Sequence, residues 1–260
     1  LNYILSLFSI AKINWLGYEN ALWSVMMVDI WEWTPFVALI LYAGLQSLPQ
    51  EPYEAVVVDG ASPLQIFYYL TLPLLKPMIF IAILLRSIDS LKIFDIVYGL
   101  TQGGPGNATE LMSMHIYRLG FRHTNWIGRA SANAMVLLVI ITILTNILLR
   151  IMRRGTREEF KMSPLMNYTR RRKVKNIILD LLIALVVIIC VFPFIWMFMT
   201  SIKTRVQTID PSIWFFQPTL ENYRAIFQKR DMFMYINNSI IVVLFTTLVS
   251  VALGTFAAYG

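Results

Sequence analysis

The sequence predicts an all-α integral membrane protein with about five transmembrane helices. Hydrophobic residues fill 57% of the 260 positions and charged residues only 14%, an apolar share well above that of soluble domains. A spanning helix needs roughly 18 to 20 consecutive apolar residues. Three uncharged runs reach this length, at residues 130–149, 181–202 and 232–260. The bilayer is therefore the expected solvent for much of this chain.

Two further spans are expected although both carry charges. Residues 21–45 are apolar except for Asp29 and Glu32, and residues 74–98 contain four charges that alternate in sign every third position: Arg86, Asp89, Lys92 and Asp95. On one helix, each of these four would have an opposite charge one turn away. Such a ladder is expected to face protein or a water-filled cavity, because lipid contact would be expensive. The alternative is an amphipathic helix that lies partly outside the membrane.

The net charge of +7 is concentrated in one place. Residues 150–175 hold ten of the 22 Lys and Arg residues, between two predicted spans, and the positive-inside rule places this segment in the cytoplasm. Parity then places residues 46–72 inside, and residues 100–129 and 201–231 outside. The basic segment lacks a folded face with interleaved aromatic residues, so no nucleic-acid partner is expected.

A polar, glycine-containing segment separates the first two expected spans. Pro52 has the backbone angle of a first helical position, and Gly60 can adopt the left-handed conformation that ends a helix. Ser62 and Pro63 then form an N-cap and first-position pair that begins a second helix. We expect a helix, a sharp turn and a second helix at the cytoplasmic surface. This elbow could transmit a push from a partner, or it could be an ordinary connection.

The stretch EAVVVDGASPLQIFYYLTLP, residues 54–73, resembles the EAA loop of ABC importer permeases. That loop has the pattern Glu-Ala-Ala, three residues, Gly, nine residues, Ile, one residue, Leu-Pro. The present chain departs from it at Val56, which replaces the third residue of the triplet, and at Leu70, which replaces Ile. Both replacements are apolar. The segments FDIVYGLTQGGP and GRASANAMVLLVIITIL, which come later, resemble the carbohydrate-uptake branch, of maltose type.

This resemblance implies a permease in a bacterial or archaeal cytoplasmic membrane that imports a carbohydrate, with a partial type I ABC importer permease fold. In the family, a companion permease, two cytoplasmic ATPase subunits and an extracytoplasmic solute-binding protein complete the importer. ATP would be bound by the partner, and this chain would carry no cofactor; it has no Gly-rich phosphate loop ending in Lys-Ser or Lys-Thr. The residues implied in ATPase coupling are Glu54, Ala55, Asp59, Gly60, Ala61, Leu72 and Pro73.

From about residue 175 onward, FPFIWMFMTSIK and the segment beginning YINNSIIVVL resemble the amino-terminal part of the companion permease. We therefore expect residues 1–162 to be the carboxy-terminal part of one permease, residues 163–175 a basic cytoplasmic junction, and residues 176–260 the amino-terminal part of the other. The chain begins without Met and stops within an apolar run, which leads us to expect a fragment that does not transport by itself.

Residues of the solute pathway are expected among the intramembrane charges. Asp29 and Glu32 are three residues apart and could hydrogen-bond sugar hydroxyls, or they could lie at the outer surface. Arg86 and Asp89 are the other candidates. Trp23, Trp31 and Trp33 could stack on sugar rings, although tryptophans near a membrane boundary are more often interfacial anchors.

The sequence also bears on two other classes of function. An intramembrane enzyme would need a nucleophile with a base, or a metal cluster, and Ser131 and Asp180 have no partners at a recognisable spacing. His115 and His123 occur without cysteines or an acidic cluster, so we expect neither an enzyme nor a metal site. The alternative transporter is a proton-coupled one that uses the ladder from Arg86 to Asp95 and needs no ATPase.

Overall fold

The computed structural model describes residues 2–9, 11–123, 126–155, 173–209, 214, 216–228 and 231–260, and every regular element in these ranges is a helix. The chain divides into two compact units. The first comprises Leu1–Met114, Leu144–Met152 and Phe233–Gly260, and the second comprises His115–Ile143 and Arg153–Met232. The basic junction expected at residues 163–175 falls mostly outside the described residues.

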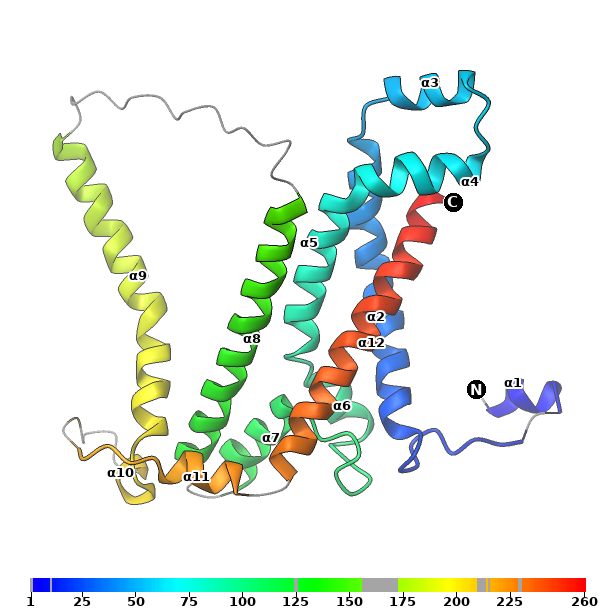
Figure 1. Ribbon diagram of the computed structural model, residues 1–260. Coiled ribbons are helices and arrows are strands. Elements are labelled where there is room, and N and C mark those ends of the chain that lie inside the picture. The colour runs from blue at the N-terminus through cyan, green and yellow to red at the C-terminus, as the bar shows by residue number, and fades with distance from the viewer. Residues whose placement is uncertain are drawn as a thin grey trace. The chain divides into compact units, whose positions relative to one another are not determined.

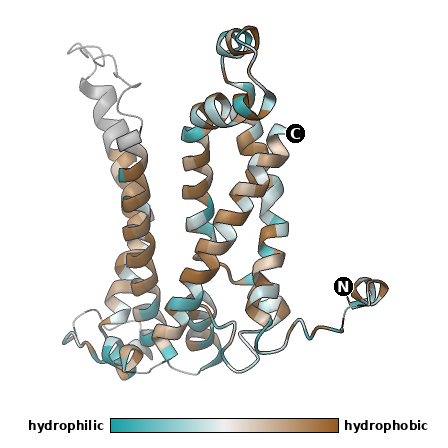
Figure 2. Cartoon of the chain, turned by 45° about the vertical axis from the view of Figure 1, so that its right-hand side comes forward, coloured by the Kyte–Doolittle hydropathy of each residue, from teal (hydrophilic) through white to brown (hydrophobic). Residues whose placement is uncertain are grey.

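The five expected spans are confirmed. Five helices within the described ranges are long and apolar enough to cross a membrane. They are α2 (Ala21–Gln46), the helix over Pro63–Ser90, α8 (Ile127–Gly155), α9 (Lys173–Ser201) and α12 (Asp231–Tyr259). Figure 2 shows hydrophobic residues distributed along these long helices, interspersed with less hydrophobic ones. The all-α membrane class predicted from composition is therefore the observed one.

The second span differs from the expectation at its carboxy end. The helix α5 (Leu72–Ser90) ends at Ser90, and α6 (Asp95–Leu100) is a separate helix. The prediction that the four charges from Arg86 to Asp95 lie on one helix is therefore wrong. Backbone turns close the end of α5, since the amide of Lys92 donates to the carbonyl of Asp89 at 2.9 Å. Arg86 instead pairs with Asp29 of α2, so a contact between helices outweighs the local spacing of charges.

The first unit is a bundle of α2, α5 and α12 (Figure 1). One cluster of its buried apolar residues consists of Val37, Leu41, Leu75, Ala82 and Val251. The helices α2 and α12 approach each other at Gly254, where an added Cβ would lie 2.8 Å from Cγ1 of Val37. Small residues of this kind allow close packing between membrane helices, where the hydrophobic effect contributes little.

Opposite ends of this bundle carry two different connections. At one end lie α3 (Glu51–Val58), α4 (Pro63–Ile66) and the π-helical segment η1 (Phe67–Thr71), together with the end of α12 (Figure 1). At the other end, loop 101–111 follows α6 and is fixed to the start of α12. The side-chain amide of Asn238 donates to the carbonyls of Ala108 and Glu110, both at 3.3 Å, and the amide of Met112 donates to the Ser239 hydroxyl at 3.1 Å.

The remaining short helices are α1 (Asn2–Leu7), α7 (Met112–Tyr117), the π-helical η2 (Arg118–Arg122), α10 (Arg205–Ile209) and α11 (Glu221–Phe227). In the second unit, Asn222 of α11 donates its side-chain amide to the carbonyls of Ser201 and Lys203, at 3.0 and 2.8 Å. The buried Lys203 ammonium lies over the rings of Trp196 and Phe216, at 5.5 and 5.2 Å. These contacts join the end of α9 to α11.

Replacing Gly254 by leucine should destabilise the first unit, because the new side chain would collide with Val37 and with the backbone of Ala38. Overpacking of this kind typically costs about 1–3 kcal/mol. We expect a lower thermal midpoint for the purified chain in detergent. Ala252→Leu on the exposed side of the same helix is the matched control, and equal midpoints for the two variants would show that α12 does not pack closely on α2.

Candidate functional site

The elbow, residues 51–73, begins with a short helix that ends in a fully bonded turn. Gly60 adopts a φ of 78°, its amide donates to the carbonyl of Val57 at 3.0 Å, and the amide of Ala61 donates to the carbonyl of Val56 at 3.2 Å. This pair of bonds is the Schellman motif, which satisfies the last carbonyls of a helix and reverses the chain. The left-handed glycine predicted at this position is confirmed.

The second helix of the elbow is capped as the sequence predicts. The Ser62 hydroxyl accepts from the Gln65 amide at 3.4 Å, and the Gln65 side chain accepts from the Ser62 amide at 2.8 Å. This reciprocal capping box satisfies two otherwise unpaired donors at the helix start, where Pro63 occupies the first position. Two consecutive capping motifs therefore define the turn between α3 and α4.

The segment between the elbow and the membrane-spanning helix is π-helical. The chain continues without interruption from α4 through η1 into α5, and its direction changes along this stretch (Figure 1). Pro73 has no amide hydrogen to donate to the preceding turn, which accounts for a local departure from α-helical bonding. The change of direction is thus spread over η1, a π-helical feature that the sequence analysis did not predict.

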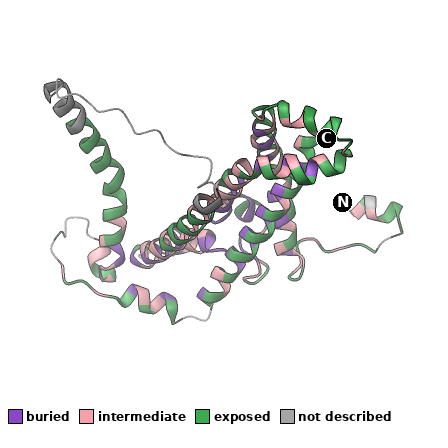
Figure 3. Cartoon of the chain, turned by 45° about the horizontal axis from the view of Figure 1, so that its top comes forward, coloured by how far each residue is buried: buried purple, intermediate pink, exposed green. Residues whose placement is uncertain are grey.

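The residues predicted to couple to an ATPase lie at the surface of the elbow. Glu54, Ala55, Asp59 and Gly60 are exposed, and α3 contributes no buried side chain (Figure 3). The turn forms an open hollow lined by Val56, Asp59, Gly60, Ala61, Gln65, Tyr69 and Leu70. Glu54 and Ala55 lie outside the residues that line this hollow, on the helix that precedes it. Leu72 and Pro73 lie at the start of α5.

The exposed surface of the elbow is both acidic and apolar. Residues 46–72 hold Glu51, Glu54 and Asp59 and no lysine or arginine. Large apolar side chains are exposed beside them, including Val58, at 86% of its full accessibility, and Tyr69, at 82%. Exposed apolar residues grouped with polar ones are typical of a surface that binds a partner.

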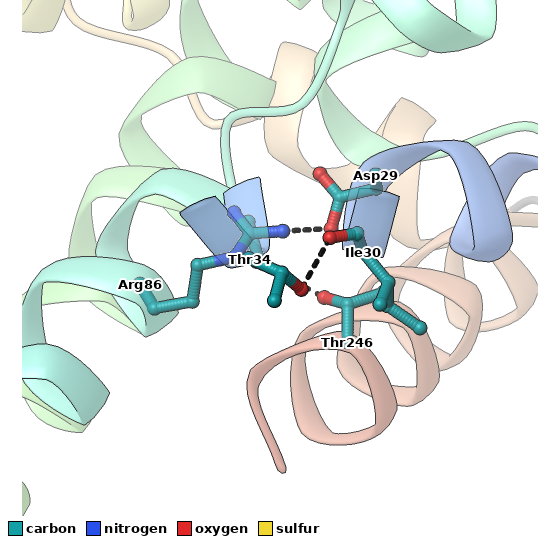
Figure 4. A network of polar contacts seen from close by, with 6 residues as sticks. Asp29, Ile30, Thr34, Arg86 and Thr246 are labelled. Carbon is teal, nitrogen blue, oxygen red and sulfur yellow. Dashed lines mark hydrogen bonds and ion pairs between the residues drawn. The ribbon is translucent and has the colours of Figure 1, made fainter. Parts of the chain in front are cut away.

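A buried ion pair joins α2 to α5 inside the first unit. The Arg86 guanidinium binds the Asp29 carboxylate, and both side chains are almost completely inaccessible to solvent. Figure 4 shows the two side chains pointing toward one another from their separate helices. The Arg86 guanidinium also lies 5.3 Å from the centroid of the Trp33 ring. Arg86 therefore binds a residue 57 positions away rather than completing the expected ladder with Asp89.

Hydroxyl groups surround this ion pair. Thr34 donates its hydroxyl to the Ile30 carbonyl at 2.6 Å within α2. The hydroxyls of Ser90, on α5, and Thr246, on α12, lie 3.2 Å apart. The cluster thus includes groups from all three helices of the bundle. The sequence reasoning missed Ser90 and Thr246, because no local pattern reveals a pair that is 156 residues apart.

The other predicted pathway residues are in different surroundings. Glu32 is exposed, whereas Asp29 on the same helix is fully buried, so the two do not form one polar site. Asp89 forms a half-exposed ion pair with Lys92 at 3.5 Å. Trp31 is exposed, and Trp23 packs edge-on against Phe245 of α12 with ring centroids 5.1 Å apart. The structure therefore brings together Asp29 and Arg86 but not the four candidates as a set.

Comparison with protein families connects this arrangement to a known class. Residues 2–158 match the family described as binding-protein-dependent transport system inner membrane component. The chain belongs to this family. Membership agrees with the permease resemblance of the elbow and with the multi-pass cytoplasmic-membrane location expected from the apolar runs.

Curated relatives of this inner membrane component come from archaea and bacteria. The trehalose/maltose transport system permease protein MalF of Thermococcus litoralis is 42% identical over 154 residues, which cover 58% of this chain and 50% of the relative. The sulfoquinovosyl glycerol transport system permease protein SmoG of Agrobacterium fabrum is 38% identical over 150 residues, covering 54% and 48%. The chain spans about half the length of these relatives. No solved structure matches.

Arg86→Met should strongly destabilise this inner membrane component, because it leaves the Asp29 carboxylate buried without a counter-charge. Breaking a buried pair in this way costs about 3–5 kcal/mol, whereas replacing both partners by apolar residues is often neutral. We therefore expect the double variant Asp29→Leu with Arg86→Met to recover most of the lost thermal stability in detergent.

Lys92→Met is the matched control for this experiment. Its ion pair with Asp89 is half-exposed and should contribute only about 0–1 kcal/mol. If Arg86→Met melted at the same temperature as Lys92→Met, the buried pair would not be the contact that holds α2 against α5.

Proposed function

We propose that this chain is a transmembrane permease component of an ATP-binding-cassette importer for a carbohydrate, coupled to a separate ATPase through the elbow. The observation that carries the proposal is the hollow of the elbow, lined by Asp59, Gly60 and Ala61 and formed by two consecutive capping motifs. This surface is well defined in backbone geometry and yet has its apolar side chains exposed. It is suited to receive a partner's residues.

The elbow is also suited to deliver a partner's movement into the membrane. The helix that follows Gly60 continues from Pro63 to Ser90, so the element that leaves the docking turn is continuous with a spanning helix. Tyr53 of α3 donates its hydroxyl to the buried Thr71 hydroxyl at 3.1 Å, which fixes the first helix of the elbow to this continuous helix. A displacement of α3 would therefore reach α5.

In this proposal, the chemistry of ATP belongs to the partner. Two cytoplasmic ATPase subunits would bind ATP, and their closure would shift the permease between inward-open and outward-open states. A companion permease would complete the pathway, and an extracytoplasmic solute-binding protein would deliver the solute. A carbohydrate is supported by the names of two relatives, which are permeases of trehalose/maltose and sulfoquinovosyl glycerol transport systems.

We also propose that the chain contains parts of two permeases. Residues 1–162 would be the carboxy-terminal part of one, residues 163–175 a cytoplasmic junction, and residues 176–260 the amino-terminal part of its companion. The family match supports the first boundary, because it covers residues 2–158. The distinct resemblance that begins near residue 175 supports the second.

For the solute pathway, the proposed candidates are Asp29, Glu32, Arg86 and Asp89. Arg86 and Asp89 line a small hollow together with Trp33 and Phe36. Within the described residues, Nε and Nη1 of Arg86 are buried without a hydrogen-bond partner. An aromatic surface beside unpaired donors and a carboxylate matches the chemistry of a sugar hydroxyl.

The decisive test is co-purification of this chain with the sugar-importer ATPase encoded beside it, comparing Glu54→Ala with Glu51→Ala. Both glutamates are exposed on α3, but only Glu54 belongs to the proposed docking motif. Loss of a charge-assisted hydrogen bond should weaken binding by about 10- to 100-fold. Glu51→Ala should bind like the unmodified chain.

Gly60 offers a second test that depends on backbone conformation. Gly60→Pro cannot adopt the observed φ of 78° and removes the amide bonded to Val57, so it should abolish binding. Gly60→Asn should retain most of it, because asparagine tolerates the left-handed region and an added Cβ meets no atom within 4 Å. Binding that is insensitive to both Glu54→Ala and Gly60→Pro would contradict ATPase docking at the elbow. It would favour a self-powered transporter.

A further inference from the structure

The orientation of the elbow is not determined by residues 51–73 alone. The helix α3 buries no side chain, and the link from α4 to α5 passes through η1, whose π-helical turn is wider and less regularly bonded than an α-helical one. A helix joined through such a segment can change direction with little loss of hydrogen bonding. Some other contact must therefore hold the elbow at its observed angle.

Phe67, the first residue of η1, makes this contact with the end of α12. Its side chain is only 6% exposed, although its neighbours Tyr68 and Tyr69 are exposed. The Phe67 ring lies 4.6 Å from the Tyr259 ring and 6.1 Å from the Phe256 ring, measured between centroids. Aromatic pairs within 4.5 to 7 Å attract one another beyond the effect of buried area. The rings thus meet at the place where the elbow bends.

A second contact joins the same two elements. The Tyr259 hydroxyl donates to the Pro63 carbonyl at 3.5 Å, a long hydrogen bond to the first residue of α4. Tyr259 therefore touches the elbow on both sides of α4, through its ring at Phe67 and through its hydroxyl at Pro63. The carboxy-terminal end of α12 therefore limits both the rotation and the displacement of α4.

The carboxy-terminal end of α12 itself packs closely on α2. Gly254, less than one turn before Phe256, packs so closely on α2 that an added Cβ would lie 3.1 Å from the amide nitrogen of Ala38. Val251 is part of the buried core. The aromatic residues that meet Phe67 thus project from a fixed helix, which a positioning contact requires.

We propose that Phe67, clamped by Tyr259 and Phe256 of α12, positions the elbow relative to the membrane bundle. The contact is a positioning one, since none of the three residues lines the docking hollow. Its role in transport rests on the proposed function. If α12 belongs to the companion permease, the elbow of one permease part is oriented by a helix of the other. A single docking event would then displace both parts together.

The test measures the elbow angle directly, without the ATPase. Spin labels at Val58→Cys on α3 and Leu39→Cys on α2 occupy exposed positions, and Cys190→Ser first removes the single native cysteine. In the otherwise unmodified chain in lipid nanodiscs, the distance between the labels should show one narrow distribution. Phe67→Ala and Tyr259→Ala should broaden it and reduce its main peak.

Two matched variants separate positioning from general stability. Tyr259→Phe keeps the ring and should retain the narrow distribution, whereas Leu253→Ala removes an exposed side chain from the same helix and should have no effect. Should Phe67→Ala fail to fold, the comparison of Tyr259→Ala with Tyr259→Phe decides the question. An unchanged distribution in Tyr259→Ala, or equal broadening in Leu253→Ala, would overturn the proposal.

The same variants then enter the co-purification assay with the ATPase. Failure of the unmodified chain to bind the ATPase would contradict the proposed function, but the label distances would still report on the clamp. Conversely, normal ATPase binding together with an unchanged elbow angle in Tyr259→Ala would overturn the clamp and leave the docking proposal intact.

Discussion

The buried ion pair between Arg86 and Asp29 is the strongest constraint on how α2 and α5 can pack together. An unpaired charge is costly in an apolar environment, so α2 and α5 must pack with Asp29 and Arg86 in contact. Apolar packing between membrane helices is weakly specific, since lipid tails are equally apolar, whereas a buried pair stays paired in only one register of α2 against α5. The hydroxyl of Ser90, on α5, lies 3.2 Å from that of Thr246, so α12 also contacts α5 in this part of the bundle.

Features governed by neighbouring residues could be predicted from the sequence, and features governed by distant residues could not. The left-handed Gly60 and the cap at Ser62 follow from the conformational preferences of single residues, and both are observed. The charge spacing from Arg86 to Asp95 is equally local, but the single-helix ladder that it predicted is wrong. The partner of Arg86 is on another helix, and α5 ends at Ser90. The π-helical bend likewise depends on tertiary contacts as well as on Pro73.

The elbow combines two properties that are seldom found together. Its backbone is closely specified by a Schellman motif and a capping box, yet its apolar side chains remain exposed. Ordering a segment that buries so little of its own surface costs conformational entropy. This cost is understandable if a partner buries the segment, because a pre-ordered surface loses less entropy on binding. Its acidic character further favours a partner with basic residues around the docking cleft.

The helix α12 contacts other elements of the first unit along most of its length. Asn238 and Ser239 bind the backbone of loop 101–111 at one end, Thr246 meets Ser90 near the centre, and Tyr259 meets the elbow at the other. Packed interiors transmit displacement because they resist compression. A single helix that contacts both segments therefore links the elbow to loop 101–111 through packed contacts within one unit.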